Sequence, residues 1–462
     1  MHNPQQQQHS LAAQTHANVP LALASSLQDM ASSPTLAINE AVAARRAAGR
    51  KTIHLGFGEA SFPLHPLLNE AMARAAKHTG YAPVAGIPSL RQAIAAYLGR
   101  TRGLTFTPDN IIVAPGSKPL LYTLLQALEG DVLLPVPSWV SYAPQARLAG
   151  RRVIAVETDA SDHHRLTPQA LADALARARF EGGNPRILIV NTPSNPTGSM
   201  FSHEDAQSIA HWSREYGITL ISDEIYAELA HGWREHVSPA QFYPEGCIVT
   251  GGLSKAFSAG GWRLGYAALP GGATGKQLMK SMRALASEIW SSATTPVQEA
   301  AAVAYSDNAE LTAYVKASAF IHGYATARLY EALIEAGALC PRPAGGFYLY
   351  PDFAPWRDAL LKRGVSTSEQ LAMHLLEQWD IAALPGTAFG EQPQELRLRL
   401  ATSMLYTPQE AQTESEREAI LWAMLGQAEK WTNGEQADGI VLEMPALVQA
   451  GARLREFMES LT

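Results

Sequence analysis

The amino-acid sequence predicts an α/β protein with a parallel sheet covered by helices on both faces, and a smaller α+β domain. Two observations support this prediction. In the middle of the chain, short runs that are apolar throughout alternate with longer helical patterns, and from Asn308 onward the sequence changes to long helices rich in Ala and Leu. Strands buried on both faces read as continuous apolar runs, and helices supply the crossovers between parallel strands.

The apolar runs define the expected strands one by one. They cover residues 111–114, 132–134, 186–190, 219–222 and 247–250, and an amphipathic helical pattern over 119–128 follows the first of them. An alternating pattern at 346–350 predicts a strand of the smaller domain. Because ligands bind at the carboxyl ends of parallel strands, the residues that follow each run form the candidate site.

The chain is expected to divide into four parts. Residues 1–20, rich in Gln, His and Asn, read as a disordered tail and not as a signal peptide, because they lack a charged start and an apolar core. Residues 21–56 are expected to pack with the smaller domain, residues 57–307 to form the larger domain and residues 308–462 the smaller one. The smaller domain would thus combine both ends of the chain.

Composition excludes several classes of function. The 462 residues are 47% hydrophobic and 17% charged, with a formal net charge of −7 and no basic block, so nucleic acid is not an expected partner. No run of about 18 apolar residues predicts a membrane span. Cys247 and Cys340 lie far apart in sequence, which argues against a disulfide framework or a metal site and favours the cytoplasm.

Lys255 is the most informative residue of the candidate site. It lies among glycines, a serine and apolar residues in GGLSKAF at 251–257. Desolvation in such surroundings lowers the pKa of a lysine and frees its amine, and such an amine forms Schiff bases with carbonyl cofactors. An ordinary lysine in a Gly-rich turn is the alternative for this segment alone.

A carboxylate and a phenol three residues apart follow the run at 219–222. If the chain turns helically there, Asp223 and Tyr226 point the same way. An aspartate can hold a pyridinium nitrogen protonated, and a tyrosine hydroxyl can bond an oxygen on the same ring. The alternatives are a capping aspartate and a core tyrosine. Glu224 is the nearer rival of Asp223, but it is expected to point away.

An amide and an indole follow two other runs. Asn195 lies in NTPSNPTG at 191–198, where its side chain, restricted by the following proline, can meet a ring oxygen or a substrate carboxylate. Trp139 follows a proline and a serine, and its indole can stack on a heteroaromatic ring. A bland turn and a core tryptophan are the alternatives.

A helix start offers an anion site. Gly116, Ser117 and Lys118 precede the first helical pattern, so their backbone N–H groups favour a bound phosphate. Arg263, eight residues after Lys255, can supply a full charge to the same phosphate. Every helix has an N-terminus, so this feature gains its value from agreement with the others.

In these motifs, their order and their spacing, the chain resembles the class I/II aminotransferases, pyridoxal-phosphate enzymes of fold type I, and most resembles their bacterial aspartate/aromatic-type branch. The likeness spans about residues 33–403 and resumes in the last helix. It implies a mostly parallel sheet of seven strands in the larger domain. It also implies these cofactor contacts: Lys255 covalently, Asp223 at the pyridine nitrogen, Tyr226 and Asn195 at the ring oxygen, and Trp139 stacked on the ring.

The resemblance places the phosphate among four residues: Gly116, Ser117, Lys118 and Arg263. One departure from the family pattern concerns this group. Gly252 stands where many relatives have a serine that bonds the phosphate, and Ser254 is the candidate substitute.

Two further matches concern the substrate and the assembly. Gly58, in GEASF at 58–62, inherits a backbone contact with the substrate carboxylate, near Trp139 and Asn195. Tyr81 matches a tyrosine that reaches the phosphate of the neighbouring subunit. The resemblance therefore implies a homodimer with shared active sites.

The carboxylate-binding arginine of the family falls on Arg397, in LRLRLATS at 396–403. Strand alternation puts Arg397 and Arg399 on one face, so periodicity does not choose between them, and the motif favours Arg397. Arg399 stands where the family has a small polar residue. A solvated or paired charge is favoured there over a reader of acidic side chains.

Residues 405–441 depart from the family pattern, in which the arginine strand leads straight to the final helix. They contain an amphipathic pattern over 414–430, and the final helix is expected at 445–461. A surface decoration is favoured over an interface or a lid.

The resemblance implies an aminotransferase that moves the amino group of an L-amino acid to a 2-oxo acid through a pyridoxamine phosphate intermediate, with Lys255 as general base and acid. Elimination, decarboxylation and oxidation use the same cofactor and fold, so they stay alternatives. A non-catalytic sensor that binds the cofactor is a further alternative function. Stoichiometric conversion of the cofactor to its pyridoxamine form by an amino acid would distinguish transamination from these reactions.

Overall fold

The computed structural model describes residues 33–462, except residue 233, residues 407–412 and residues 435–440. The predicted disordered tail at 1–20 lies outside the described residues. The helices are α1 (Pro34–Ala47), α2 (Pro66–Ala75), α3 (Pro88–Arg102), α4 (Ser117–Ala127), α5 (Tyr142–Leu148), α6 (Pro168–Phe180), α7 (His203–Glu215), α8 (Gly272–Ile289), α9 (Thr295–Ala304), α10 (Ala309–Glu335), α11 (Arg357–Lys362), α12 (Ser368–Trp379), α13 (Glu414–Thr432) and α14 (Pro445–Glu459). The strands are β1 (Ile53–His54), β2 (Ile111–Ala114), β3 (Asp131–Val136), β4 (Val153–Glu157), β5 (Pro185–Asn191), β6 (Thr219–Asp223), β7 (Cys247–Gly252), β8 (Gly265–Ala268), β9 (Tyr348–Leu349), β10 (Ile381–Ala382), β11 (Leu384–Pro385) and β12 (Leu398–Ala401).

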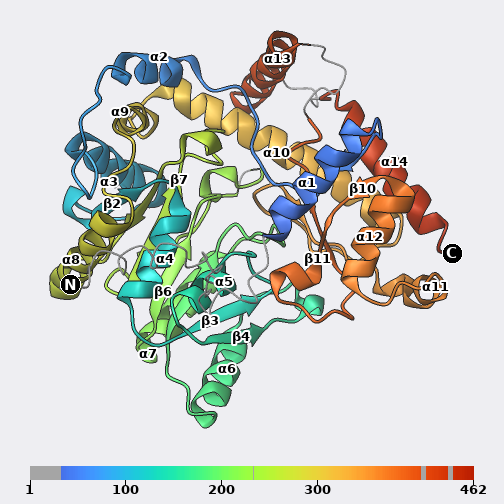
Figure 1. The fold of residues 1–462 in the computed structure, drawn as a ribbon, viewed down its shortest axis with the longest axis horizontal. Helices are drawn as coiled ribbons and strands as arrows, with labels where there is room; N and C mark the ends of the chain where they lie inside the picture. Colours follow the sequence, from blue (N-terminus) through green and yellow to red (C-terminus); the bar gives the residue numbers. More distant parts are fainter. Residues whose placement is uncertain (1–32, 233, 407–412, 435–440) are drawn as a thin grey trace, which may run out of the picture. The chain divides into compact units, whose positions relative to one another are not determined.

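Seven strands form the central sheet, in the order β2-β8-β7-β6-β5-β3-β4 (Figure 1). The five strands from β7 to β4 are parallel neighbours, whereas β8 runs antiparallel to β2 and β7. The expected mostly parallel sheet of seven strands is confirmed. The five predicted runs correspond to β2, β3, β5, β6 and β7. β4 escaped prediction because it is an edge strand that buries only alternate residues. β8 escaped prediction because it is short and consists mainly of small residues, GYAA.

Helices cover both faces of this sheet. Along β2, Ile111 and Val113 pack in one hydrophobic cluster with residues of α3, α6, α7 and α9. Their neighbours Ile112 and Ala114 pack in a second cluster with residues of α4, α5 and α8. Strand side chains alternate between faces, so a run that is apolar throughout requires a hydrophobic layer on each side, as the sequence predicts.

The C-terminal part of the chain begins with the long helix α10. The side chain of Asn308 caps this helix by accepting a hydrogen bond from Leu311 N at 3.0 Å. Two small sheets follow, an antiparallel one ordered β11-β12-β9 and a parallel pair of β1 with β10. Figure 1 shows α1, in blue, beside these C-terminal elements in orange. The proposed domain boundaries themselves stay a prediction.

The insertion contributes a helix to the hydrophobic core. The predicted helix at 414–430 is α13, and the final helix is α14. Leu421, Met424, Leu425 and Ala428 are buried on one face of α13 at helical spacing. They belong to the same hydrophobic cluster as residues of α10 and α14. The described part of the insertion is therefore not a surface decoration.

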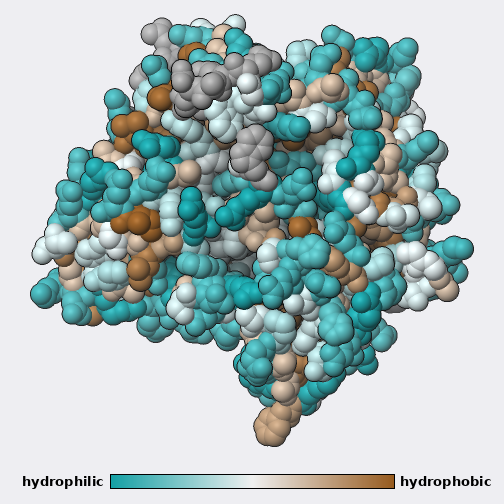
Figure 2. Space-filling view, turned by 180° about the vertical axis from the view of Figure 1, so that it is seen from behind, coloured by the Kyte–Doolittle hydropathy of each residue, from teal (hydrophilic) through white to brown (hydrophobic). Residues whose placement is uncertain are grey.

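Within the described ranges, no helix is long and apolar enough to cross a membrane. On the face seen in Figure 2, hydrophobic residues form small separate patches between hydrophilic ones. Single exposed apolar residues of this kind are normal on protein surfaces.

Candidate active site

A cavity of about 360 Å³ lies at the carboxyl edge of the central sheet. The predicted site residues that line it are Gly58, Ser117, Lys118, Trp139, Asn195, Asp223, Tyr226, Ser254, Lys255 and Arg263. Residues that line it but escaped prediction include Ser33, Thr35, Phe57, Tyr142, Asn191 and Tyr348. Arg399, for which the sequence favoured a solvated or paired charge, lines it as well. The structure thus brings together side chains from strand ends that are far apart in the sequence. The predicted residues Tyr81, Gly116 and Arg397 are not among the lining residues.

Lys255 carries its amine on a short turn after β7. Its Nζ donates a hydrogen bond to the backbone oxygen of Gly58 at 2.8 Å. Burial lowers the pKa of Lys255 to about 8, against the opposing charge of Glu59 and with the help of the Arg399 charge. The unprotonated amine therefore becomes the main form above about pH 8, which is the form that attacks a carbonyl.

Asp223 ends β6 and is buried. Hydroxyl groups occupy both carboxylate oxygens: Tyr142 Oη donates to Oδ2 at 2.8 Å and Thr250 Oγ1 to Oδ1 at 3.1 Å. Burial raises the pKa of Asp223 to about 6. A cationic ring nitrogen beside this carboxylate would favour its ionised form.

The turn from Gly116 to Ser117, the predicted anion site, leads into the start of α4. Gly116 has a left-handed φ of 96°, and a Cβ there would lie 2.4 Å from Nη2 of Arg263. Arg263 itself has a φ of 53°, an uncommon conformation for a residue with a side chain. Its guanidinium thus reaches the N-terminus of α4. The positive charge of the guanidinium and the free N–H groups of the helix both favour a bound phosphate.

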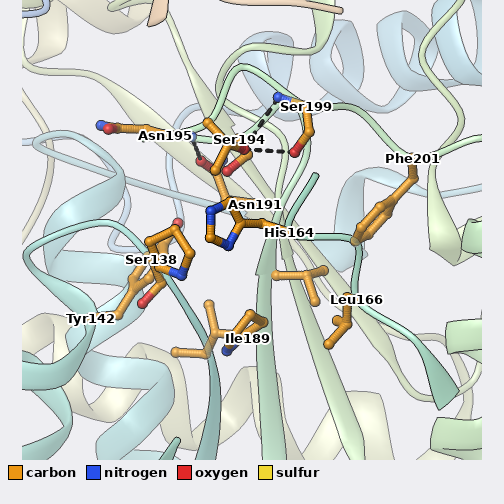
Figure 3. A pocket seen from close by; sticks show the side chains of 14 residues that line it. Ser138, Tyr142, His164, Leu166, Ile189, Asn191, Ser194, Asn195, Ser199 and Phe201 are labelled. Carbon is orange, nitrogen blue, oxygen red and sulfur yellow. Dashed lines mark hydrogen bonds between the residues drawn. The ribbon is translucent and has the colours of Figure 1, made fainter. Parts of the chain in front are cut away.

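The loop after β5 is tied to the end of β6. Asn191 Nδ2 donates to the backbone oxygen of Asp223 at 2.7 Å, and Asn191 Oδ1 accepts from the backbone N–H of Asn195 at 2.7 Å. Figure 3 shows this bond beside a second cavity of about 50 Å³, into which His164 points. The two hydrogen bonds of Asn191 therefore fix Asn195 relative to Asp223.

The second cavity holds no additional charge from His164. Burial lowers the pKa of His164 to about 4, so this ring is neutral.

Trp139 and Lys118 lie together in the cavity lining. Lys118 Nζ lies 5.2 Å from the centre of the Trp139 ring. Burial and the charge of Arg263 lower the pKa of Lys118. The backbone N–H of Lys118 belongs to the helix N-terminus, but its ammonium extends over the indole. The backbone N–H of Lys118 is thus available to a phosphate, and its ammonium to another ligand group.

Tyr226 meets a second tyrosine that the sequence did not indicate. The hydroxyl groups of Tyr226 and Tyr348 lie 2.8 Å apart, and both rings are buried. Tyr348 ends a glycine-rich run that reads as a core strand, so its position in the cavity had no local signal. The Arg399 guanidinium lies 4.8 Å from the centre of the Tyr348 ring.

Arg399 and Arg397 have opposite surroundings. Arg399 is 1% exposed, donates to Asn195 Oδ1 at 3.4 Å and to the backbone oxygen of Gly56, and its Nε has no hydrogen-bond partner among the described residues. Arg397 lies outside the cavity lining, and three carboxylates surround its guanidinium at 2.8 to 3.0 Å: Asp352, Glu391 and Glu395. This geometry does not favour the predicted role of Arg397 as the carboxylate ligand, because its charge is already paired.

These residues fit pyridoxal phosphate. The cofactor has a carbonyl, a ring nitrogen, a ring oxygen and a phosphate, and the cavity offers a reactive amine, a buried carboxylate, a phenol with an amide, and a helix N-terminus with an arginine. Gly265 supports this fit, because a Cβ there would lie 2.3 Å from the backbone nitrogen of Ser117. The anion turn is packed directly on β8.

Comparison with known proteins agrees with the site. The family described as aminotransferase class I and II matches residues 50–408. An aspartate aminotransferase of Geobacillus stearothermophilus is 37% identical over 391 residues, which cover 83% of this chain and 95% of that protein. An aspartate/prephenate aminotransferase of Thermus thermophilus is 34% identical over 385 residues, which cover 82% of this chain and 94% of that protein. The solved aspartate aminotransferase of Thermus thermophilus with maleate has a TM-score of 0.75 at 32% identity, over 88% of this chain and 100% of that one.

The chain therefore belongs to the class I and II aminotransferases and has PLP fold type I. It is a pyridoxal-phosphate-dependent aminotransferase of the bacterial aspartate-type branch, which moves an amino group between an amino acid and a 2-oxo acid. The family, fold type, cofactor and reaction that the sequence resemblance implied are confirmed.

Replacing Gly265 should displace the anion turn and weaken cofactor binding. In Gly265→Ala the new Cβ meets backbone atoms of Gly116 and Ser117 at 2.5 and 2.3 Å. Overpacking of this kind costs about 1–3 kcal/mol, so the Kd for pyridoxal phosphate, measured by absorbance titration of the apoprotein, should rise about fivefold to 100-fold. Gly261→Ala is the control, because a Cβ there has no neighbour within 4 Å. Equal Kd values for the two variants would contradict the fit.

Proposed function

We propose that Arg399, in place of Arg397, binds the α-carboxylate of the amino acid during transamination. One observation carries this proposal: a buried guanidinium lines the cavity, and its hydrogen bonds within the described part of the chain go to neutral oxygens only. Burial lowers the pKa of Arg399, since a desolvated charge without a counter-ion is unfavourable. A substrate carboxylate would supply that counter-ion through two parallel hydrogen bonds.

We propose in addition that the substrate is a dicarboxylic amino acid. Lys118 supports this, because its exposed side chain lines the cavity, where its ammonium lies over the Trp139 ring and meets the Arg263 charge. A second carboxylate on the substrate would relieve that repulsion. The relatives named for aspartate, and the relative solved with the dicarboxylate maleate, agree with this substrate class.

The cavity residues divide between cofactor and substrate. Pyridoxal phosphate, when bound, supplies a reactive carbonyl and an electron-withdrawing ring. The residues proposed to hold it are Lys255, Asp223, Tyr226, Asn195, Trp139, Gly116, Ser117, Ser254 and Arg263. Gly58 and Trp139 would border the substrate beside Arg399. Asn195 would orient Arg399, because its side-chain oxygen accepts a hydrogen bond from that guanidinium.

Lys255 is proposed as the base that takes the proton from the substrate Cα. A lysine serves as a base only when its amine is unprotonated. The lowered pKa of Lys255 brings that form close to neutral pH. Its hydrogen bond to Gly58 keeps Nζ on the same side of the cavity as the segment that borders the substrate.

A homodimer with shared active sites is proposed from Tyr81. Its side chain is 95% exposed on the single chain, at a distance from the cavity lining. By family resemblance this tyrosine reaches the phosphate in the neighbouring subunit. The cytoplasm is proposed as the location because both cysteines are free and lie far apart in sequence.

Replacing each of the two arginines separately tests which of them binds the substrate carboxylate. Arg399→Gln should raise the KM for the amino acid about 100-fold, because losing a buried charged hydrogen-bond pair costs about 2–5 kcal/mol. Arg397→Gln should leave KM nearly unchanged and lower Tm, because Asp352 and Glu391 lose their cation. Steady-state kinetics and thermal unfolding of both holoenzymes measure this. A raised KM in Arg397→Gln alone would restore the original assignment.

Replacing Lys118 tests the substrate class. Lys118→Met should slow the half-reaction with aspartate about tenfold at subsaturating concentration and leave alanine unaffected, because only aspartate has a second carboxylate. The absorbance of the bound cofactor follows each half-reaction, so no dicarboxylic acceptor is needed. The cofactor Kd is the control for the nearby phosphate site. Equal loss with both amino acids would reject a role in reading the side chain.

Mixing two inactive variants tests the shared sites. Lys255→Ala lacks the amine and Tyr81→Ala lacks the phenol, so each should be nearly inactive as a homodimer. A hybrid dimer would contain one site with both residues intact, and statistical mixing should restore about a quarter of the wild-type activity. Activity of the mixture after subunit exchange measures this. No recovery, despite hybrids seen by mass spectrometry, would argue against a shared site.

A further inference from the structure

The segment of residues 58–65 begins at the wall of the cavity. Gly58 and Glu59 line it, and the backbone oxygen of Gly58 accepts the hydrogen bond from Lys255. A Cβ on Gly58 would lie only 2.2 Å from the hydroxyl of Tyr348, so backbone and phenol are in close contact. Small movements of this segment therefore change the space available beside Lys255.

Tyr406, the last described residue before the gap at 407–412, holds the far side of this segment. Its ring stacks on Phe62 with centroids 4.4 Å apart and an angle of 1° between the planes. Its hydroxyl accepts a hydrogen bond from the backbone N–H of Ser61 at 3.2 Å. Both rings are buried, and His322 of α10 lies edge-on to each of them at 5.3 Å.

The helix of the insertion holds the end of the same segment. Trp422 of α13 lies 6.2 Å from the ring of His65 and 6.1 Å from that of Tyr314. Tyr314 in turn donates a hydrogen bond to the backbone oxygen of Pro63 at 3.1 Å. Aromatic contacts from both sides of the gap at 407–412 therefore converge on residues 61–65.

We propose that Tyr406 and Trp422 are positioning residues that hold residues 58–65 against Lys255, so that the insertion shapes the substrate side of the cavity. The proposed cofactor contacts lie on other elements, at the start of α4, the end of β6 and the turn before β8. Loosening the segment therefore acts on the amino acid more than on the cofactor. The effect on substrate rests on the proposed function, whereas the effect on backbone order does not.

Hydrogen exchange of the full-length holoenzyme tests the backbone part. Tyr406→Leu and Trp422→Ala should speed amide exchange in residues 58–65 about tenfold, because aromatic pairs contribute about 0.5–1.5 kcal/mol beyond their buried area. Trp431→Ala is the matched control: it removes an indole of α13 that stacks on Phe320 of α10, with centroids 4.3 Å apart. It should leave exchange in residues 58–65 unchanged.

Kinetics of the same variants tests the functional part. Tyr406→Leu and Trp422→Ala should raise the KM for the amino acid about fivefold to tenfold, with kcat and the cofactor Kd within about twofold of wild type. Tyr406→Phe keeps the stack and loses only the hydroxyl acceptor, so it should restore KM while exchange at Ser61 stays faster.

Three results would overturn the proposal. The first is unchanged amide exchange in Tyr406→Leu, and the second is faster exchange with an unchanged KM. The third is a lower Tm, weaker cofactor binding and a higher KM in all variants alike, including Trp431→Ala. If the unmodified holoenzyme fails to convert any amino acid, the proposed function fails instead, and the exchange result still decides whether Tyr406 and Trp422 order the segment.

Discussion

Desolvation of charged groups in one cavity is the constraint on which the site depends. Burial lowers the pKa of Lys255 and Arg399 and raises that of Asp223, so each group lies in surroundings that disfavour its charge. Their hydrogen-bond partners are hydroxyl, carbonyl and amide groups. Such an arrangement costs stability in the free protein and favours a ligand with complementary charges. The cofactor and a carboxylate substrate are ligands of this kind.

The surrounding fold holds these charges in place by pairing their neighbours elsewhere. Glu224 follows Asp223 directly, yet its carboxylate points away from the cavity to Arg102, at 3.4 Å, and accepts hydrogen bonds from Ser222 and Ser238. Arg397 likewise lies two residues from Arg399 and is paired with three carboxylates. In each of these two pairs one charge is paired within the protein scaffold and the other is left available, which restricts the number of places where a ligand charge can bind.

Much of the site could be predicted because its residues follow buried strands. Runs that are apolar throughout identify β2, β3, β5, β6 and β7, and the side chains just beyond them meet at one edge of a parallel sheet. The choice between Arg397 and Arg399 could not be made this way. Asp352 is 45 residues from Arg397 in sequence, and only the folded chain brings the two together. The family motif favoured the arginine whose charge is paired in the folded chain, by Asp352 and by two glutamates.

The sequence by itself determined the fold class, the family and most of the groups proposed to hold the cofactor, because these depend on local patterns: apolar runs, a helix start, and a lysine among small residues. Tertiary structure alone decided which arginine enters the cavity, that Tyr142 and Tyr348 join it, and that α13 belongs to the core beside residues 58–65. The physical reason is that burial and ion pairing depend on neighbours that are distant in sequence, and these determine whether a charge is available to a ligand or already paired.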